Sequence, residues 1–110
     1  MKMQERISKG VNTLTDTGIK PAVLREIQEF ARKYHIRKVI LFGSRARGDY
    51  RRTSDIDLAT QGGSHARFAV DVDELSSTLL KFDCVDLDGS VQPELLKSIE
   101  QEGIVIYEEI

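Results

Sequence analysis

Residues 42–58 read FGSRARGDYRRTSDIDL and contain the pattern that decides the fold. The stretch opens with Gly43 and Ser44 and closes with two aspartates, Asp55 and Asp57, separated by one residue. Glycine permits a tight turn or a close backbone approach that a Cβ would block. Because Phe42 ends the apolar run KVILF, we expect the Gly-Ser pair to form the turn after a buried strand.

The residues after this turn suggest an anion site. Ser44 offers a hydroxyl and a backbone amide where a short helical turn could start, and such a start presents free N–H donors to a phosphate. Arg45 and Arg47 could add charge-assisted hydrogen bonds. The alternative is an ordinary strand-to-helix turn with solvated arginines, and the Gly-Ser dipeptide alone is too common to exclude it.

The aspartates belong to the alternating segment DIDLAT, which predicts a strand with Asp55 and Asp57 on one face. Carboxylates so placed are about 6.6 Å apart along the strand and repel each other, and aspartate is disfavoured in strands. A divalent cation between them would offset both costs, and oxygen ligands suit Mg²⁺. A polar edge strand facing water is the alternative for this pattern taken alone.

The surrounding sequence alternates helical and strand patterns. Apolar periodicity, Pro and Gly predict helices at 21–34, 66–80 and 93–102, a weaker helix at 3–17, and strands at 38–42, 55–60, 82–87 and 104–107. Such alternation favours the α/β (α+β) class. We expect a small mixed sheet of about four strands, with helices on one face and an acidic cleft on the other.

Composition limits the number of domains and the kinds of partner that we expect. The chain has 110 residues, 31% charged and 40% hydrophobic, so we expect one domain over 1–110, with its core at about 21–107 and an N-terminal helical extension at 1–20. A net charge of −2 gives no case for nucleic-acid or membrane binding. With one cysteine, no signal peptide and no long apolar run, the sequence predicts a cytoplasmic protein.

The Gly-Ser pair, ten further residues and Asp-Ile-Asp together resemble the G-S-x10-D-x-D signature of the polymerase β-like nucleotidyltransferases. The resemblance covers about 36–107 and is strongest to the minimal nucleotidyltransferase branch, small proteins often paired with a helical HEPN-type partner. It implies the polymerase β-like fold, ATP as substrate and Mg²⁺, with two ions expected. By this resemblance the phosphate-binding positions are Gly43, Ser44, Arg45 and Arg47, and Asp55 and Asp57 bind metal.

A third carboxylate is expected in the segment FDCVDLD, which offers Asp83, Asp86 and Asp88. Asp83 and Asp86 are three residues apart, so in a regular strand only one of them can join the aspartate pair. Choosing Asp83 leaves Phe82 and Cys84 facing the helices, and the family's pattern also places the ligand at the first aspartate. We therefore expect Asp83 to bind the second metal ion or to accept the nucleophile's proton.

The resemblance also implies a reaction and a partner. We expect an enzyme that transfers AMP from ATP to a hydroxyl, in particular a tyrosine of a cognate HEPN toxin, which makes the chain an AMPylating antitoxin in a hetero-oligomer. A chain of 110 residues has no room for a separate acceptor-binding domain. Arg51 and Arg52 are expected to be solvated or to face the acceptor. A non-catalytic antitoxin of the same fold, or nucleotidyl transfer to a small molecule or an RNA end, remains an alternative.

Overall fold

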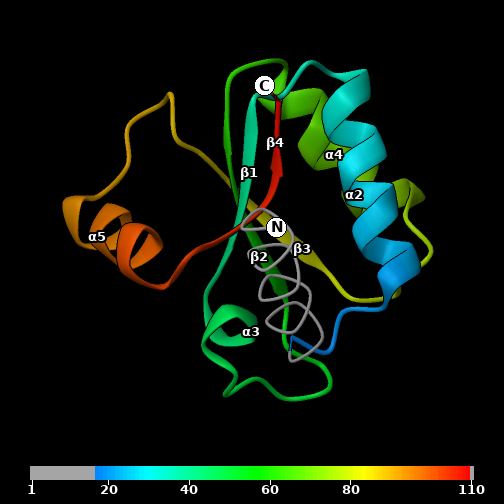
Figure 1. Ribbon diagram of the computed structural model, residues 1–110, viewed down its shortest axis with the longest axis horizontal. Helices are drawn as coiled ribbons and strands as arrows, with labels where there is room; N and C mark the ends of the chain where they lie inside the picture. The colour runs from blue at the N-terminus through cyan, green and yellow to red at the C-terminus, as the bar shows by residue number, and fades with distance from the viewer. Residues whose placement is uncertain (1–16, 110) are drawn as a thin grey trace, which may run out of the picture.

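The computed structural model describes residues 17–109, so most of the helix expected at 3–17 lies outside the described residues. The elements follow one another closely along the chain (Figure 1). They are α2 (Pro21–Lys33), β1 (Lys38–Phe42), α3 (Ser44–Arg47), β2 (Ile56–Gln61), α4 (His65–Leu75), β3 (Phe82–Asp86), α5 (Pro93–Glu102) and β4 (Ile104–Glu108).

The four strands form one mixed sheet in the order β3-β2-β1-β4. Strand β1 pairs antiparallel with both β2 and β4, whereas β2 and β3 run parallel. Asp57 of β2 lies opposite Phe42 on one side and opposite Asp83 on the other. Residues paired across neighbouring strands point to the same face, so this register decides which side chains can meet.

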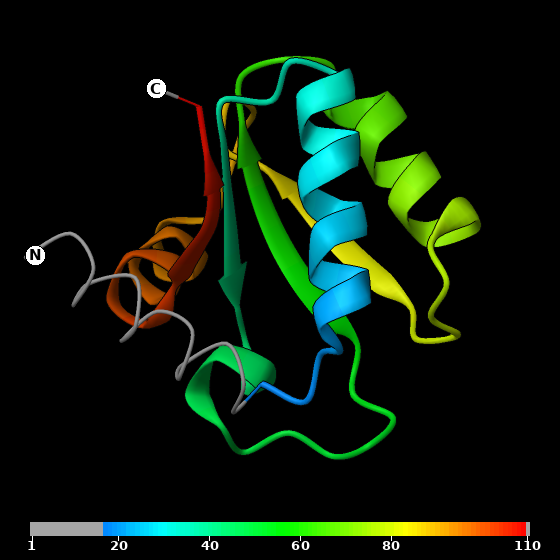
Figure 2. The ribbon, with the colours of Figure 1, turned by 45° about the vertical axis from the view of Figure 1, so that its right-hand side comes forward.

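Helices α2 and α4 cover one face of the sheet, and the main core lies between them and the strands (Figure 2). Pro21 occupies the first turn of α2, as its sequence position predicts, and Ile27 of the same helix is fully buried. Phe68 and Val72 are the buried residues of α4. Phe82 and Cys84 of β3 pack against this core, which confirms that these two side chains face the helices.

Helix α5 lies on the opposite face of the sheet (Figure 2), so the expectation of helices on one face needs correction. Ile99 of α5 is 2% exposed and forms a second, smaller apolar cluster with Phe42 and Ala59. The chain crosses the sheet because β3 is an edge strand and β4 adds at the other edge, beyond β1. The acidic residues of β2 and β3 therefore share their face with a helix.

Helix α4 ends at Leu75, earlier than the predicted end at residue 80. Leu75 and Leu79 are 63% and 102% exposed, so the apolar spacing that suggested a longer helix was misleading. Ser76 is extended (φ −71°, ψ 160°), and the backbone N–H and hydroxyl of Ser77 donate to the Glu26 carboxylate. Such side-chain bonds compete with helix continuation, and residues 76–81 instead form a connection that leads into β3.

Candidate active site

Gly43 brings the backbone directly against the Asp57 carboxylate. Its φ of 77° lies in the left-handed region that favours glycine. A Cβ at this position would lie 2.2 Å from Asp57 Oδ2, well inside van der Waals contact. The turn thus requires glycine for its conformation and for the space that the carboxylate occupies.

The expected short helical turn follows as α3. The backbone N–H groups of Ala46 and Arg47 donate to the Gly43 carbonyl. Those of Ser44 and Arg45 precede the first possible bond of the helix and donate to no group within residues 17–109. Within the described residues, two unoccupied backbone donors therefore directly follow Gly43, the residue that contacts the Asp57 carboxylate.

Asp57 and Asp83 are neighbours on adjacent parallel strands and point to the same face of the sheet. Asp83 and Asp55 are exposed, whereas Asp57 is partly buried. Burial, followed by the charges of Asp83 and Asp55, raises the pKa of Asp57 from its ordinary 3.8 to about 6, against the opposing effect of Arg47 and Arg45. The three aspartates form a cluster of like charge that a cation would stabilise.

Asp86 lies on the opposite face. Its partner on β2 is Thr60, whose hydroxyl is bonded to the His65 ring. The Asp86 carboxylate accepts the backbone N–H of Asp88, and the Asp88 carboxylate accepts that of Gly62. These two aspartates therefore hold the turn after β3, and of the candidates in that segment only Asp83 lies beside Asp57.

Arg45 does not face a phosphate site, contrary to the sequence expectation. Its side chain is 2% exposed, and its guanidinium donates to the backbone carbonyls of Thr17, Ser54, Arg51 and Arg52. The ring of Tyr50 stacks at 4.8 Å from the guanidinium carbon. Four of its five N–H donors are thus occupied by carbonyls, and the buried side chain is not exposed to a nucleotide. Arg45 instead fixes the loop between α3 and β2.

Arg47 is exposed and lies between two carboxylates. Its Nε is 3.3 Å from Asp49 Oδ2, and its Nη1 is 3.2 Å from Glu102 Oε1. The hydrogen bonds to Glu102 and then Asp49 raise the pKa of the guanidinium above its ordinary value. Glu102 is the last residue of α5. Arg47 is therefore paired with a carboxylate from a distant segment, a contact that the sequence alone did not indicate.

Magnesium fits the donors of the aspartate cluster only in part. Within the described residues no three carboxylate, imidazole or thiol groups converge closely enough to hold a metal ion. Mg²⁺ commonly takes one or two protein carboxylates and completes its shell with water and substrate phosphates. Asp57, beside Asp83 and with a raised pKa, fits such an incomplete site.

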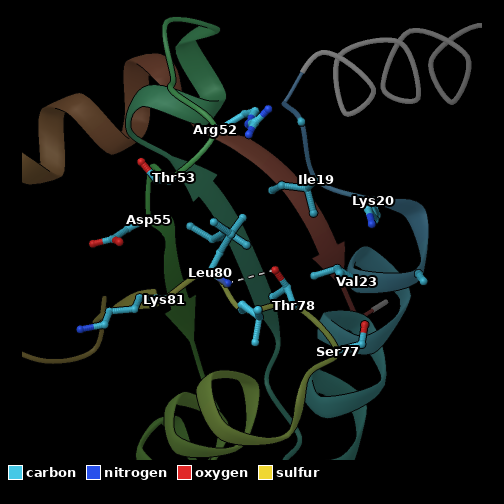
Figure 3. A pocket seen from close by; sticks show the side chains of 14 residues that line it. Ile19, Lys20, Val23, Arg52, Thr53, Asp55, Ser77, Thr78, Leu80 and Lys81 are labelled. Carbon is cyan, nitrogen blue, oxygen red and sulfur yellow. Dashed lines mark hydrogen bonds between the residues drawn. The ribbon is translucent and has the colours of Figure 1, made fainter.

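A groove of about 780 Å³ includes Asp55 and lies beside the residues at which β2 and β3 begin. Ile19 and Val23 project toward its centre from one side (Figure 3). Asp55 and Lys81 border the other side and direct their charged ends outward (Figure 3). The groove therefore adjoins the aspartate cluster through Asp55.

Residues 25–109 match the family described as polymerase beta, nucleotidyltransferase. The chain belongs to this family. It is a family of nucleotidyltransferase enzymes, which confirms the sequence-based assignment of the fold and of the enzyme class. The chain is also similar to a putative protein adenylyltransferase of Methanocaldococcus jannaschii, with 35% identity over 82 residues that cover 66% of this chain and 79% of the relative.

Solved structures with the same fold include toxin-antitoxin proteins. A toxin-antitoxin structure with AMP-PNP is 22% identical, covers 78% of this nucleotidyltransferase and 73% of the matched chain, and has a TM-score of 0.65. A mutant of the toxin-antitoxin pair MntA-HpeT is 23% identical over the same shares, with a TM-score of 0.63. At these identities the likeness concerns the fold. Within residues 17–109, no helix of the nucleotidyltransferase is long and apolar enough to cross a membrane.

The single cysteine of the nucleotidyltransferase has no nucleophilic role. Burial, followed by the neighbouring charges of Asp83, Asp73 and Asp57, raises the pKa of the Cys84 thiol to about 12. A thiol with so high a pKa carries almost no thiolate at neutral pH. The expectation that Cys84 is a small core residue fits its packing against the main core.

Proposed function

We propose that this nucleotidyltransferase transfers AMP from ATP to a hydroxyl of a partner protein, namely a tyrosine of a HEPN-type toxin in the cytoplasm. One observation carries the proposal. Asp57 lies beside Asp83 on one side and against the Gly43 turn on the other. Carboxylates for a metal ion and free backbone N–H donors for a phosphate therefore adjoin one another, as nucleotidyl transfer requires.

Each residue of the site has a distinct role in the proposal. Asp57 and Asp83, with Asp55 beside them, would hold one or two Mg²⁺ ions together with water and substrate oxygens, because the carboxylates alone form only part of a site. The backbone at Gly43 and Ser44 binds the β- and γ-phosphates of ATP. Arg47 is exposed beside this turn and assists once it leaves its carboxylate partners.

The reaction breaks a phosphoanhydride bond of ATP and forms a phosphoester bond to the acceptor. The acceptor hydroxyl oxygen forms a bond to the α-phosphorus, and the bond from the α-phosphorus to the bridging oxygen of the β-phosphate breaks. Pyrophosphate leaves with that electron pair, and the hydroxyl proton passes to the exposed Asp83 carboxylate or to water. Bound Mg²⁺ supplies charge neutralisation on the phosphate oxygens.

The protein acceptor is supported by similarity. The Methanocaldococcus relative bears the name of a protein adenylyltransferase, and proteins of toxin-antitoxin pairs share the fold. A groove borders the aspartate cluster at Asp55. An antitoxin that only binds and blocks its partner is the second candidate, because the fold alone would serve it.

The test uses the full chain, labelled ATP, Mg²⁺ and the purified product of the adjacent gene. The partner should gain one or more adenylyl mass increments, and the Asp55→Ala/Asp57→Ala double variant should transfer none. The Asp86→Ala variant is the matched control, since it removes a carboxylate from the opposite face. If the wild-type chain and the double variant neutralise the partner equally, with no mass change, the chain acts by binding alone.

A further inference from the structure

The groove beside the first residues of β2 and β3 has an apolar floor and a basic rim. Its floor contains Ile19, Val23 and Ile56, of which Ile56 is fully buried. Leu79 also lines the groove, and its side chain is completely exposed. An exposed leucine beside buried apolar side chains is a surface that a partner can cover. At about 780 Å³ the groove is large enough for an aromatic side chain and its neighbours.

The charges around the groove are opposite to those of the whole chain. Lys20, Arg52 and Lys81 line it together with a single carboxylate, Asp55, although the chain carries a net charge of −2. None of the three cations forms an ion pair within residues 17–109. Unpaired cations around an apolar floor match an occupant that is apolar at its centre and acidic at its edges.

The groove and the aspartate cluster meet where β2 begins: Ile56 on the groove floor packs in the main core with Val23, Asp57 points to the other face of the sheet, and Asp55 precedes both. Residues 77–81, which line the groove, lead directly into β3, and Asp55 connects the groove to the aspartate cluster.

We propose that this groove binds the acceptor: a hydroxyl-bearing segment of the partner protein, with a tyrosine beside Asp55, its apolar neighbours on the floor and acidic residues against Lys20, Arg52 and Lys81. This inference rests on the proposed transfer of AMP to a protein. It adds a recognition rule, because the sequence around the modified tyrosine must be acidic and apolar. It also assigns a role to Leu79, which packs against nothing that buries it.

The test uses two synthetic peptides with the full chain, ATP and Mg²⁺. Each peptide carries one central tyrosine flanked by leucines, with aspartate and glutamate at the outer positions of one and lysine at those of the other. Transfer is measured by the adenylyl mass increment, and a peptide with phenylalanine for tyrosine controls for the acceptor. We expect kcat/KM for the acidic peptide to exceed that for the basic peptide by about tenfold or more.

Variants then locate the recognition. Lys20→Glu should raise the KM for the acidic peptide about fivefold or more, whereas Lys97→Glu on α5, away from the groove, makes the same charge change and should not. Leu79→Asp should raise that KM about tenfold without loss of fold, because the side chain is already exposed. The affinity for Mg-ATP, measured by calorimetry, separates acceptor recognition from nucleotide binding.

Each remaining outcome has a defined meaning. If wild type adenylylates the purified partner protein but shows no preference for the acidic peptide, or transfers to neither peptide, the groove proposal is wrong and the proposed function stands. If Leu79→Asp weakens Mg-ATP binding instead, the groove holds the base of the nucleotide and the proposal is also wrong. Preferential transfer to a single-stranded RNA end would equally overturn it. Failure of wild type to bind Mg-ATP at all would count against the proposed function itself.

Discussion

Replacing Asp57 with asparagine should stabilise the protein in the absence of metal and nucleotide, and the gain should depend on pH. The folded protein raises the pKa of Asp57 from 3.8 to about 6, mainly through burial. A raised pKa means that the folded state favours the protonated carboxyl. The stability that this provides is complete below about pH 4 and is lost as pH rises through about 6. Asparagine has the same shape and no charge, so the variant escapes that loss.

The magnitude follows from the two pKa values. Each unit of pKa shift corresponds to 1.36 kcal/mol, so the shift from 3.8 to about 6 sets an upper value of about 3 kcal/mol. Asp57 is only partly buried, so solvent screening reduces this to about 1–2 kcal/mol. For a domain of this size, that difference moves Tm by about 5–10 °C.

The assay is urea unfolding of wild type and Asp57→Asn, followed by circular dichroism from pH 4 to pH 8 in the presence of EDTA. The difference in unfolding free energy between the two proteins isolates Asp57, because all other carboxylates are common to both. It should increase with pH between about 4 and 6.5 and stay constant above that range. A difference that is the same at every pH would refute the reasoning, because the carboxylate would then not be desolvated or repelled in the folded protein.

The same pair of proteins tests the cation. Adding Mg²⁺ with AMP-PNP at pH 7.5 should raise the Tm of wild type by several degrees and leave that of Asp57→Asn almost unchanged. Asp86→Asn should keep the wild-type response, because its side chain points to the other face of the sheet. An equal response of wild type and Asp57→Asn would show that the cation does not bind at the aspartate cluster.

Four further outcomes can be measured on single variants. Asp83→Ala should abolish AMP transfer while Asp86→Ala retains it; the reverse result would mean that the register of β3 is displaced by one residue. Gly43→Ala should cost about 2 kcal/mol in urea unfolding and abolish transfer, because the new methyl group meets a carboxylate. Arg45→Ala should cost at least about 3 kcal/mol by the same assay, and a loss of ATP affinity without loss of stability would contradict its structural role. Glu102→Gln should lower the KM for ATP by a few-fold in initial-rate kinetics, since it weakens the ion pair that competes with phosphate for an arginine, and an unchanged KM would rule out that competition.

The sequence predicted the strands well because their signals are local. The apolar run KVILF and the alternating DIDLAT became β1 and β2 with boundaries shifted by at most one residue. The preference for Asp83 over Asp86 followed from the two-residue period of a strand and the need to bury Phe82 and Cys84, which both pack on the main core. The register that sets Asp83 beside Asp57 then follows from parallel pairing of β2 and β3.

Contacts between distant segments could not be predicted from one sequence. The side of the sheet that α5 covers depends on how the chain crosses from β3 to β4, and no local pattern records that crossing. The early end of α4 depends on Ser77 binding Glu26, a residue 51 positions away. The groove depends on this early end, since residues 77–81 would not line it if α4 continued to residue 80.

The error over Arg45 had a local cause that the helix geometry explains. Residues two apart on a helix are separated by about 200° around its axis, so in α3 the side chains of Arg45 and Arg47 must point in nearly opposite directions. Only one of them can face the phosphate turn, and the exposed one is Arg47. Arg45 still acts on the site, because its bonds to the carbonyls of Arg51, Arg52 and Ser54 fix the loop that ends at Asp55. The two arginines of this turn therefore differ in role: Arg45 fixes the loop that carries Asp55, and Arg47 is the one that we expect to meet the substrate.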